Sequence, residues 1–94
     1  MTYHAAVYEH VYMREELGDV YREVLEASLL RPKQIAAETG RSHPTIRAYR
    51  YGYRDVTLGA ARELAEFLRG RSQEFEALAS KLEEAAMKAE DEGG

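Results

Sequence analysis

Six basic side chains stand close together in the middle of this 94-residue chain, accompanied by a single acid, Glu38. They are Arg31, Lys33, Arg41, Arg47, Arg50 and Arg54. Guanidinium and ammonium groups bind phosphate oxygens, and phosphate neutralisation supplies essentially all of the non-specific affinity of proteins for nucleic acids. The formal charge of residues 31–54 is +5, whereas residues 1–30 carry −4 and residues 55–94 carry −5. The overall charge of −4 therefore hides one segment that suits a polyanionic partner.

The residues that catalysis would need are scattered along the chain. The three histidines, His4, His10 and His43, lack the spacing that places two metal ligands on one helix, and the serines have no evident base partner. No glycine-rich loop of the kind that cradles phosphates is present. We therefore expect no enzymatic activity, no metal and no cofactor.

Composition also bounds the compartment. The chain has no cysteine, so neither a disulfide nor a cysteine-based zinc site can hold the fold. No apolar run approaches the roughly 18 residues that span a bilayer, and the N-terminus lacks the basic and apolar blocks of a signal peptide. We expect a cytoplasmic protein with no membrane segment.

The elements that must position the basic residues have helical patterns nearly throughout. Only two prolines interrupt a chain rich in Ala, Leu, Glu and Arg. The sequence therefore predicts an all-α fold, with a compact domain of four to five short helices over residues 15–70 and a C-terminal amphipathic helix over residues 71–90. Residues 1–14 form an N-terminal extension whose apolar residues fit both a helical face and strand alternation, and we favour a helix.

An amphipathic helix is expected from Glu15 to Leu29, although Gly18 costs about 1 kcal/mol inside a helix and could mark its start. Its apolar stripe recurs at steps of three and four residues. The stripe comprises Leu17, Val20, Tyr21, Val24, Leu25 and Leu29. Arg31 and Pro32 then break the chain, because the residue before a proline is pushed out of α geometry.

Two short helices separated by a glycine turn follow this break. The first is predicted over Pro32–Thr39 and ends at Gly40, which can take a positive φ. Ser42 is expected to cap the second helix, Pro44 lies in its first turn, and Gly52 ends it. The residues that face the core in these two helices are Ile35, Ala36, Ile46 and Tyr49.

A further helix is predicted from its cap, Thr57, to Leu68, and Gly70 then closes the compact domain. One side of this helix is apolar. It carries Leu58, Ala61, Leu64, Ala65 and Leu68.

The stretch from about Leu17 to Leu68 resembles the helix-turn-helix of the lambda-repressor, Cro and XRE class. In that family a small residue lies in the first motif helix, a glycine in the turn, an aliphatic residue in the second helix, an aromatic residue and a glycine near its end, and a leucine-rich helix downstream. The matching residues are Ala36, Gly40, Ile46, Tyr49, Gly52 and the helix from Leu58 to Leu68. The resemblance implies a DNA-binding protein that places the second helix in the major groove.

The resemblance also implies roles for individual residues. The candidates for contact with base edges are Ser42, His43, Pro44, Thr45, Arg47 and Ala48. The candidates for contact with phosphates are Lys33, Gln34, Arg41, Arg50, Tyr51 and Arg54. Arg47 is the strongest candidate because a guanidinium offers two donors to the paired acceptors of guanine, while Thr45 and Ala48 could sit against a thymine methyl group.

Two residues depart from the family pattern. Thr39 and Arg41 flank the turn glycine, where the family commonly has apolar residues. Both changes loosen the packing expected at the turn, and Arg41 could instead reach a phosphate.

Simpler interpretations exist for several of these residues. Arg47 and Arg50 would fit an ordinary solvated helix face, and His43 would fit a turn before Pro44. Tyr51 would fit ring packing at the helix end.

The C-terminal segment from Ser72 to Glu90 carries apolar residues at steps of three and four, namely Phe75, Leu78, Leu82, Ala85 or Ala86, and Ala89. We favour a dimerisation helix built on Phe75, Leu78, Leu82, Ala86 and Ala89. The alternative is a helix folded back over its own domain. Residues 91–94 are expected to be disordered.

These observations favour a sequence-specific transcriptional regulator of prokaryotic or phage type, acting as a repressor that binds double-stranded DNA as a homodimer on a two-fold operator. The alternative is an antitoxin-like or phage assembly or packaging protein, in which the helix-turn-helix is accessory and the terminal helices bind a protein partner.

Overall fold

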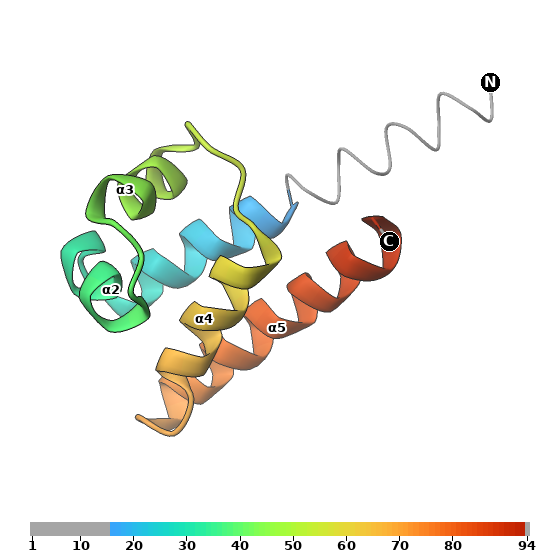
Figure 1. Ribbon diagram of the computed structural model, residues 1–94. Helices are drawn as coiled ribbons and strands as arrows, with labels where there is room; N and C mark the ends of the chain where they lie inside the picture. Colours follow the sequence, from blue (N-terminus) through green and yellow to red (C-terminus); the bar gives the residue numbers. More distant parts are fainter. Residues whose placement is uncertain (1–15, 94) are drawn as a thin grey trace.

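The computed structural model describes residues 16–93, and within this range the chain is helical with no strand, which confirms the all-α fold (Figure 1). The first described helix covers residues 16–28. Four helices follow, α2 (Pro32–Thr39), α3 (His43–Tyr51), α4 (Leu58–Leu68) and α5 (Gln73–Gly93). None of the described helices combines the length and the apolar character needed to cross a bilayer. The helix expected over residues 1–14 lies outside the described residues.

The helix over residues 16–28 turns its apolar stripe toward the core. Leu17, Tyr21, Val24 and Leu25 are each at most 3% exposed. Gly18 lies inside this helix and does not mark its start, because residues 16 and 17 are already helical.

Leu29 does not belong to this stripe, and the prediction that placed it there is wrong. Its side chain is 87% exposed and its backbone is left-handed, with φ of 60°. The amide of Leu29 donates to the carbonyl oxygen of Glu26 at 3.2 Å, which closes the last turn of the helix. The chain must change direction here to begin α2, and a left-handed residue after the helix makes that reversal.

The turn between α2 and α3 forms as the sequence predicts. Pro32 is the first residue of α2, and Gly40 follows the last one with φ of 77°. Ser42 caps α3, because its hydroxyl oxygen accepts a hydrogen bond from the amide of Thr45 at 3.2 Å. Gly52, with φ of 76°, ends α3. These capping residues fix both ends of the second helix.

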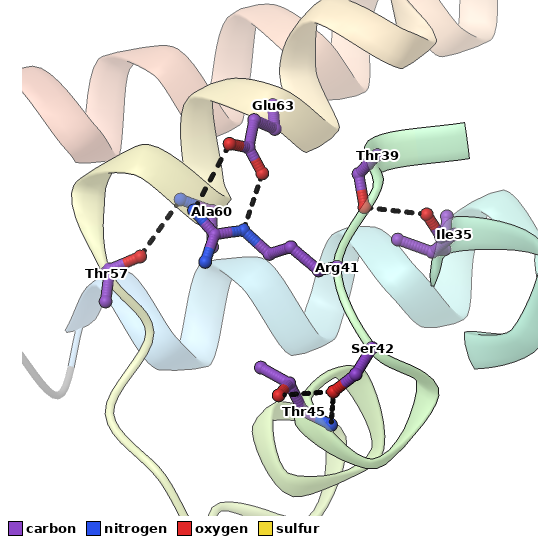
Figure 2. Close-up of polar contacts among 8 residues, drawn as sticks. All are labelled: Ile35, Thr39, Arg41, Ser42, Thr45, Thr57, Ala60 and Glu63. Atoms are coloured by element: carbon purple, nitrogen blue, oxygen red, sulfur yellow. Dashed lines mark hydrogen bonds and ion pairs between the residues drawn. The ribbon is translucent and has the colours of Figure 1, made fainter. Parts of the chain in front are cut away.

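The start of α4 is fixed in the same way. The hydroxyl oxygen of Thr57 accepts a hydrogen bond from the amide of Ala60 at 3.0 Å (Figure 2). Ala60 is buried, whereas Leu58, expected on the apolar side, is only partly buried. The buried residues of α4 are Ala60, Ala61, Leu64, Ala65 and Leu68.

One continuous core joins these helices. The rings of Tyr21 and Tyr49 meet edge to face, with centroids 5.5 Å apart and planes at 73°. Around them lie further side chains that are fully buried, namely Val24, Leu25, Ile35, Ile46, Leu64, Leu68 and Leu82. Since Leu82 belongs to α5, the C-terminal helix shares the core of the preceding helices.

The apolar face of α5 packs on α4 within the same chain, and the two helices lie side by side in Figure 1. Leu82 and Ala86 are fully buried, and Phe75, Leu78 and Ala89 are partly buried against the core. This corrects the expected dimer seam through these residues, because the face that would meet a second chain is already covered. The contacts agree with the alternative, a helix folded back over its own domain.

Ion pairs hold α5 at both ends and in the middle. Arg69 pairs with Glu76 at 3.0 Å and also with Glu83. Arg62 pairs with Glu90 at 2.8 Å, an interaction that lowers the pKa of Glu90.

Lys81 pairs with Glu23 of the first described helix, so α5 is also tied to a helix other than α4. The helix continues past Glu90 to Gly93, so Asp91 and Glu92 are helical and not disordered as expected. No glycine or proline lies between Gln73 and the two terminal glycines, so the sequence carries no signal for an earlier end of the helix.

Leu29 and Gly40 both have left-handed backbone conformations, and substitutions at these two residues should change stability in opposite directions. Leu29→Gly should raise the free energy of unfolding by about 1 kcal/mol, because glycine takes this conformation without a Cβ clash and Leu29 buries little surface. Gly40→Ala should lower it by about 1 kcal/mol, although a Cβ there meets nothing within 4 Å. Urea unfolding measures both changes. A Leu29→Gly variant less stable than the parent would contradict strain at this residue.

The packing of α5 predicts a large effect at Leu82. Leu82→Ala should lower the free energy of unfolding by about 2–5 kcal/mol, because its side chain is fully buried between α5 and the domain. Met87→Ala, on the same helix but 60% exposed, is the matched control and should change stability by less than about 0.5 kcal/mol. Denaturant unfolding at two protein concentrations measures both variants. If Leu82→Ala weakened self-association and left monomer unfolding unchanged, the folded-back α5 would be contradicted.

Candidate nucleic-acid interface

The outer face of α3 is opposite the side that packs on the core. Ile46 and Tyr49 are buried, so the residues left facing outward recur at positions i, i+1, i+4, i+5 and i+8. They are His43, Pro44, Arg47, Ala48 and Tyr51. Ala48 is half-buried and the other four are exposed. The face combines one cation with apolar and aromatic surface.

A shallow hollow lies on this face. Its volume is about 270 Å³, and Tyr53, from the loop after α3, is one of its lining residues. The rings of Tyr51 and Tyr53 have centroids 6.1 Å apart. The guanidinium carbon of Arg47 lies 5.9 Å from the centroid of the Tyr51 ring, a distance at which a cation and a ring attract each other. Arg47 is thereby held on the outer face of α3.

A larger groove of about 570 Å³ adjoins this hollow. His43, Arg47 and Tyr51 line both, so the two form one continuous surface. The end of the first described helix and the start of α2 add an apolar floor and a basic rim. The basic lining residues are Arg31, Lys33, Arg47 and Arg50, and Glu26 is the one acid.

Basic residues that pair with a carboxylate and basic residues that do not are concentrated in different parts of the described chain. Among residues 16–93, six basic side chains pair with a carboxylate, namely Arg22, Arg41, Arg62, Arg69, Arg71 and Lys81. Within the same range, those that form no ion pair are Arg31, Lys33, Arg47, Arg50, Arg54 and Lys88. Five of these six belong to residues 31–54. The uncompensated positive charge therefore lies around α3 and the start of α2.

Arg41 is the one basic residue of residues 31–54 that forms an ion pair with a carboxylate. Its Nε donates to Glu63 Oε1 at 2.5 Å and its Nη2 donates to Glu63 Oε2 at 3.2 Å, so the pair is bidentate (Figure 2). The hydrogen bonds to Glu63 raise the pKa of Arg41. The suggestion that Arg41 reaches a phosphate is corrected, because its guanidinium is committed to α4 and joins the turn to that helix.

Thr39, the other departure from the family pattern, is also accommodated at the turn. Its hydroxyl donates to the carbonyl oxygen of Ile35 at 2.8 Å (Figure 2). A polar residue before Gly40 therefore leaves no unsatisfied hydroxyl at the end of α2.

The chain matches no known family model, no curated protein and no solved structure.

The hydroxyl groups at the start of α3 bond to one another. Ser42 Oγ and Thr45 Oγ1 lie 2.7 Å apart (Figure 2), and Arg54 donates to Thr45 Oγ1 at 3.3 Å. Neither Ser42 nor Thr45 lines the hollow or the larger groove. Arg54 lines a separate hollow beside Arg22. Ser42, Thr45 and Arg54 therefore form a hydrogen-bonded group at the start of α3 that lies next to the hollow and the larger groove without lining them.

Gln34 also has a local role. Its side-chain oxygen accepts a hydrogen bond from the amide of Arg31 at 2.9 Å, which satisfies a donor at the start of α2. Gln34 lines neither the hollow on α3 nor the larger groove.

The structure thus brings together seven of the twelve residues that were expected to contact DNA. These are Lys33, His43, Pro44, Arg47, Ala48, Arg50 and Tyr51. Tyr51 lies on the outer face of α3 beside Arg47, which places it among the base-edge candidates as well as the phosphate candidates. Arg31 and Tyr53 also line this surface, and neither was among the residues that the sequence predicted to contact DNA. Arg31 was counted in the basic segment, and Tyr53 is an aromatic residue directly beyond the glycine that ends α3.

The bidentate pair gives a prediction on stability. In a double-mutant cycle, Arg41→Ala and Glu63→Ala should show a coupling of about 1 kcal/mol, because two hydrogen bonds join partly buried side chains. The control cycle uses Arg71 and Glu38, which are 4.0 Å apart and about half exposed, and its coupling should be close to zero. Thermal unfolding of the single and double variants measures both couplings. Equal couplings in the two cycles would contradict a special role for Arg41.

Proposed function

We propose that this protein is a sequence-specific DNA-binding regulator of prokaryotic or phage type that represses transcription by occupying an operator. One observation carries the proposal. Five basic side chains of residues 31–54 form no ion pair within the described part of the chain, whereas nearly all the other described basic residues do. Phosphate groups of DNA would supply the missing negative charge.

The dimensions of α3 support insertion into the major groove. An α-helix with its side chains is about 10–12 Å in diameter, which the major groove of B-DNA, about 12 Å wide, admits, and the nine residues of α3 give a face roughly 13 Å long. Arg47 lies in the middle of the outer face of α3, where its two donors could meet the O6 and N7 acceptors of one guanine.

The positions of the basic residues beside Arg47 support contacts to phosphates, while Arg47 itself contacts a base. Lys33 is in the first turn of α2, Arg31 precedes that helix, and Arg50 is on α3, and all three line the groove beside the outer face. Contacts to phosphates fix the register of a protein on DNA, while contacts to base edges read the sequence. We assign Lys33, Arg31 and Arg50 to phosphates and Arg47 to a base edge.

The family resemblance supports the same proposal. The small residue, turn glycine and core-facing aliphatic residue typical of the lambda-repressor, Cro and XRE class match Ala36, Gly40 and Ile46, which lie in α2, in the turn after it and in α3, and this order supports the proposal. A homodimer on a two-fold operator remains part of the proposal. Its interface would lie elsewhere than on the apolar face of α5, which is covered.

The proposal predicts distinct effects for Arg47 and Lys33. On a duplex selected from a random pool, Arg47→Ala should weaken binding by about 1–3 kcal/mol and relax discrimination at one base pair. Lys33→Ala should weaken binding to all sequences and reduce the slope of log K against log salt by about 0.9. Fluorescence anisotropy between 50 and 200 mM salt, taken as roughly the range over which counterion release is large, measures both effects.

Lys88→Ala is the matched control for these variants. Lys88 is exposed and forms no ion pair among the described residues, but it lies on α5, so its loss removes the same charge from another surface. Its binding should match that of the parent protein. Absence of binding to any duplex, or equal losses in Lys88→Ala and Arg47→Ala, would refute the proposed interface.

A further inference from the structure

The hollow on the outer face of α3 is mostly apolar. Pro44 and Ala48 belong to α3, and Tyr51 and Tyr53 supply two rings, so four of its six lining residues present carbon surface. Arg47 and His43 complete the lining. Tyr53 is 84% exposed although it borders this hollow. The outer face of α3 therefore carries a small, mostly apolar recess beside a cation.

The major groove offers few groups that suit such a recess. The edges of adenine, guanine and cytosine present hydrogen-bond donors and acceptors there, and thymine adds a 5-methyl group. A methyl group is small enough for a hollow of about 270 Å³ and gains free energy when it leaves water. Carbon surface next to a base edge thus favours thymine over the other bases.

Thr45 does not provide this surface, although its methyl group made it a candidate. Its hydroxyl bonds to Ser42 and accepts from Arg54, and Thr45 is not part of the hollow. Ala48 does line it, together with Tyr53, which comes from outside α3.

We propose that this hollow accepts the 5-methyl group of a thymine and that Tyr53 is a specificity-determining residue of the interface. This inference rests on the proposed function. The guanidinium of Arg47 and the ring of Tyr51, 5.9 Å apart, border the same hollow, and successive bases of a strand are about 3.4 Å apart along the helix axis. Since Arg47 also lines the hollow, we expect the thymine to lie within about two base pairs of the guanine that Arg47 reads.

Uracil substitution tests the proposal directly, because uracil lacks only the methyl group of thymine. Duplexes selected from a random pool define the site, and each thymine within two base pairs of the guanine assigned to Arg47 is replaced in turn by uracil. One replacement in each half-site should weaken binding by about fourfold, the effect of one buried methyl-sized group. Fluorescence anisotropy at constant salt measures the affinities.

Three protein variants make the test specific to the hollow. In Tyr53→Ala the uracil penalty should vanish, because the wall that covers the methyl group is gone. In Tyr53→Phe, which keeps the ring, the penalty should remain about fourfold. Met87→Ala, another exposed apolar residue but on α5, should also keep it.

The outcomes separate this proposal from the proposed function. Sequence-selective binding with no uracil penalty, a penalty that persists in Tyr53→Ala, or a selected site without thymine near that guanine would each overturn the proposal and leave the DNA-binding function intact. Absence of sequence-selective binding would overturn the proposed function and this proposal with it.

Discussion

The burial of Ile46 and Tyr49 is the constraint on which the rest of the site depends. These two residues fix the rotation of α3 about its own axis, since one face must remain in the core. The opposite face is then determined, and Arg47 lies on it. Burial of the Tyr21 hydroxyl raises its pKa, the neighbouring Tyr49 raises it further, and the group stays neutral and compatible with the core.

Two arginines outside the proposed reading face hold α3 in place. Arg41 joins the turn before α3 to Glu63 of α4 through two hydrogen bonds. Arg22 donates to the carbonyl oxygen of Tyr49 at 3.3 Å, close to the other end of α3. Each arginine is also paired with a carboxylate, Glu63 and Asp19 respectively. The basic residues among 16–93 therefore fall into those whose ion pairs and hydrogen bonds position helices and those that pair with no carboxylate in this range.

Local signals in the sequence predicted the local structure well. The bounds of α2, the left-handed Gly40 and Gly52 and the cap Ser42 all follow from residues adjacent to the feature they determine. The fate of Arg41 could not be predicted in this way, because Glu63, its partner, is 22 residues away in the sequence. The same holds for α5, whose periodicity predicted an apolar face but not what would cover it. Leu29 kept the helical spacing of its stripe and yet left the core, because the helix ends at the residue before it.

The surface formed by α3 and the start of α2 is where we propose that this protein meets DNA. The most direct test is a titration of ¹⁵N-labelled protein with a selected duplex, followed by the shifts of its backbone amide signals. We expect the largest shifts at the amides of residues 31–33 and 43–54, and nearly unchanged amide signals for α5. Shifts centred on α5, or no shifts at all, would contradict this interface.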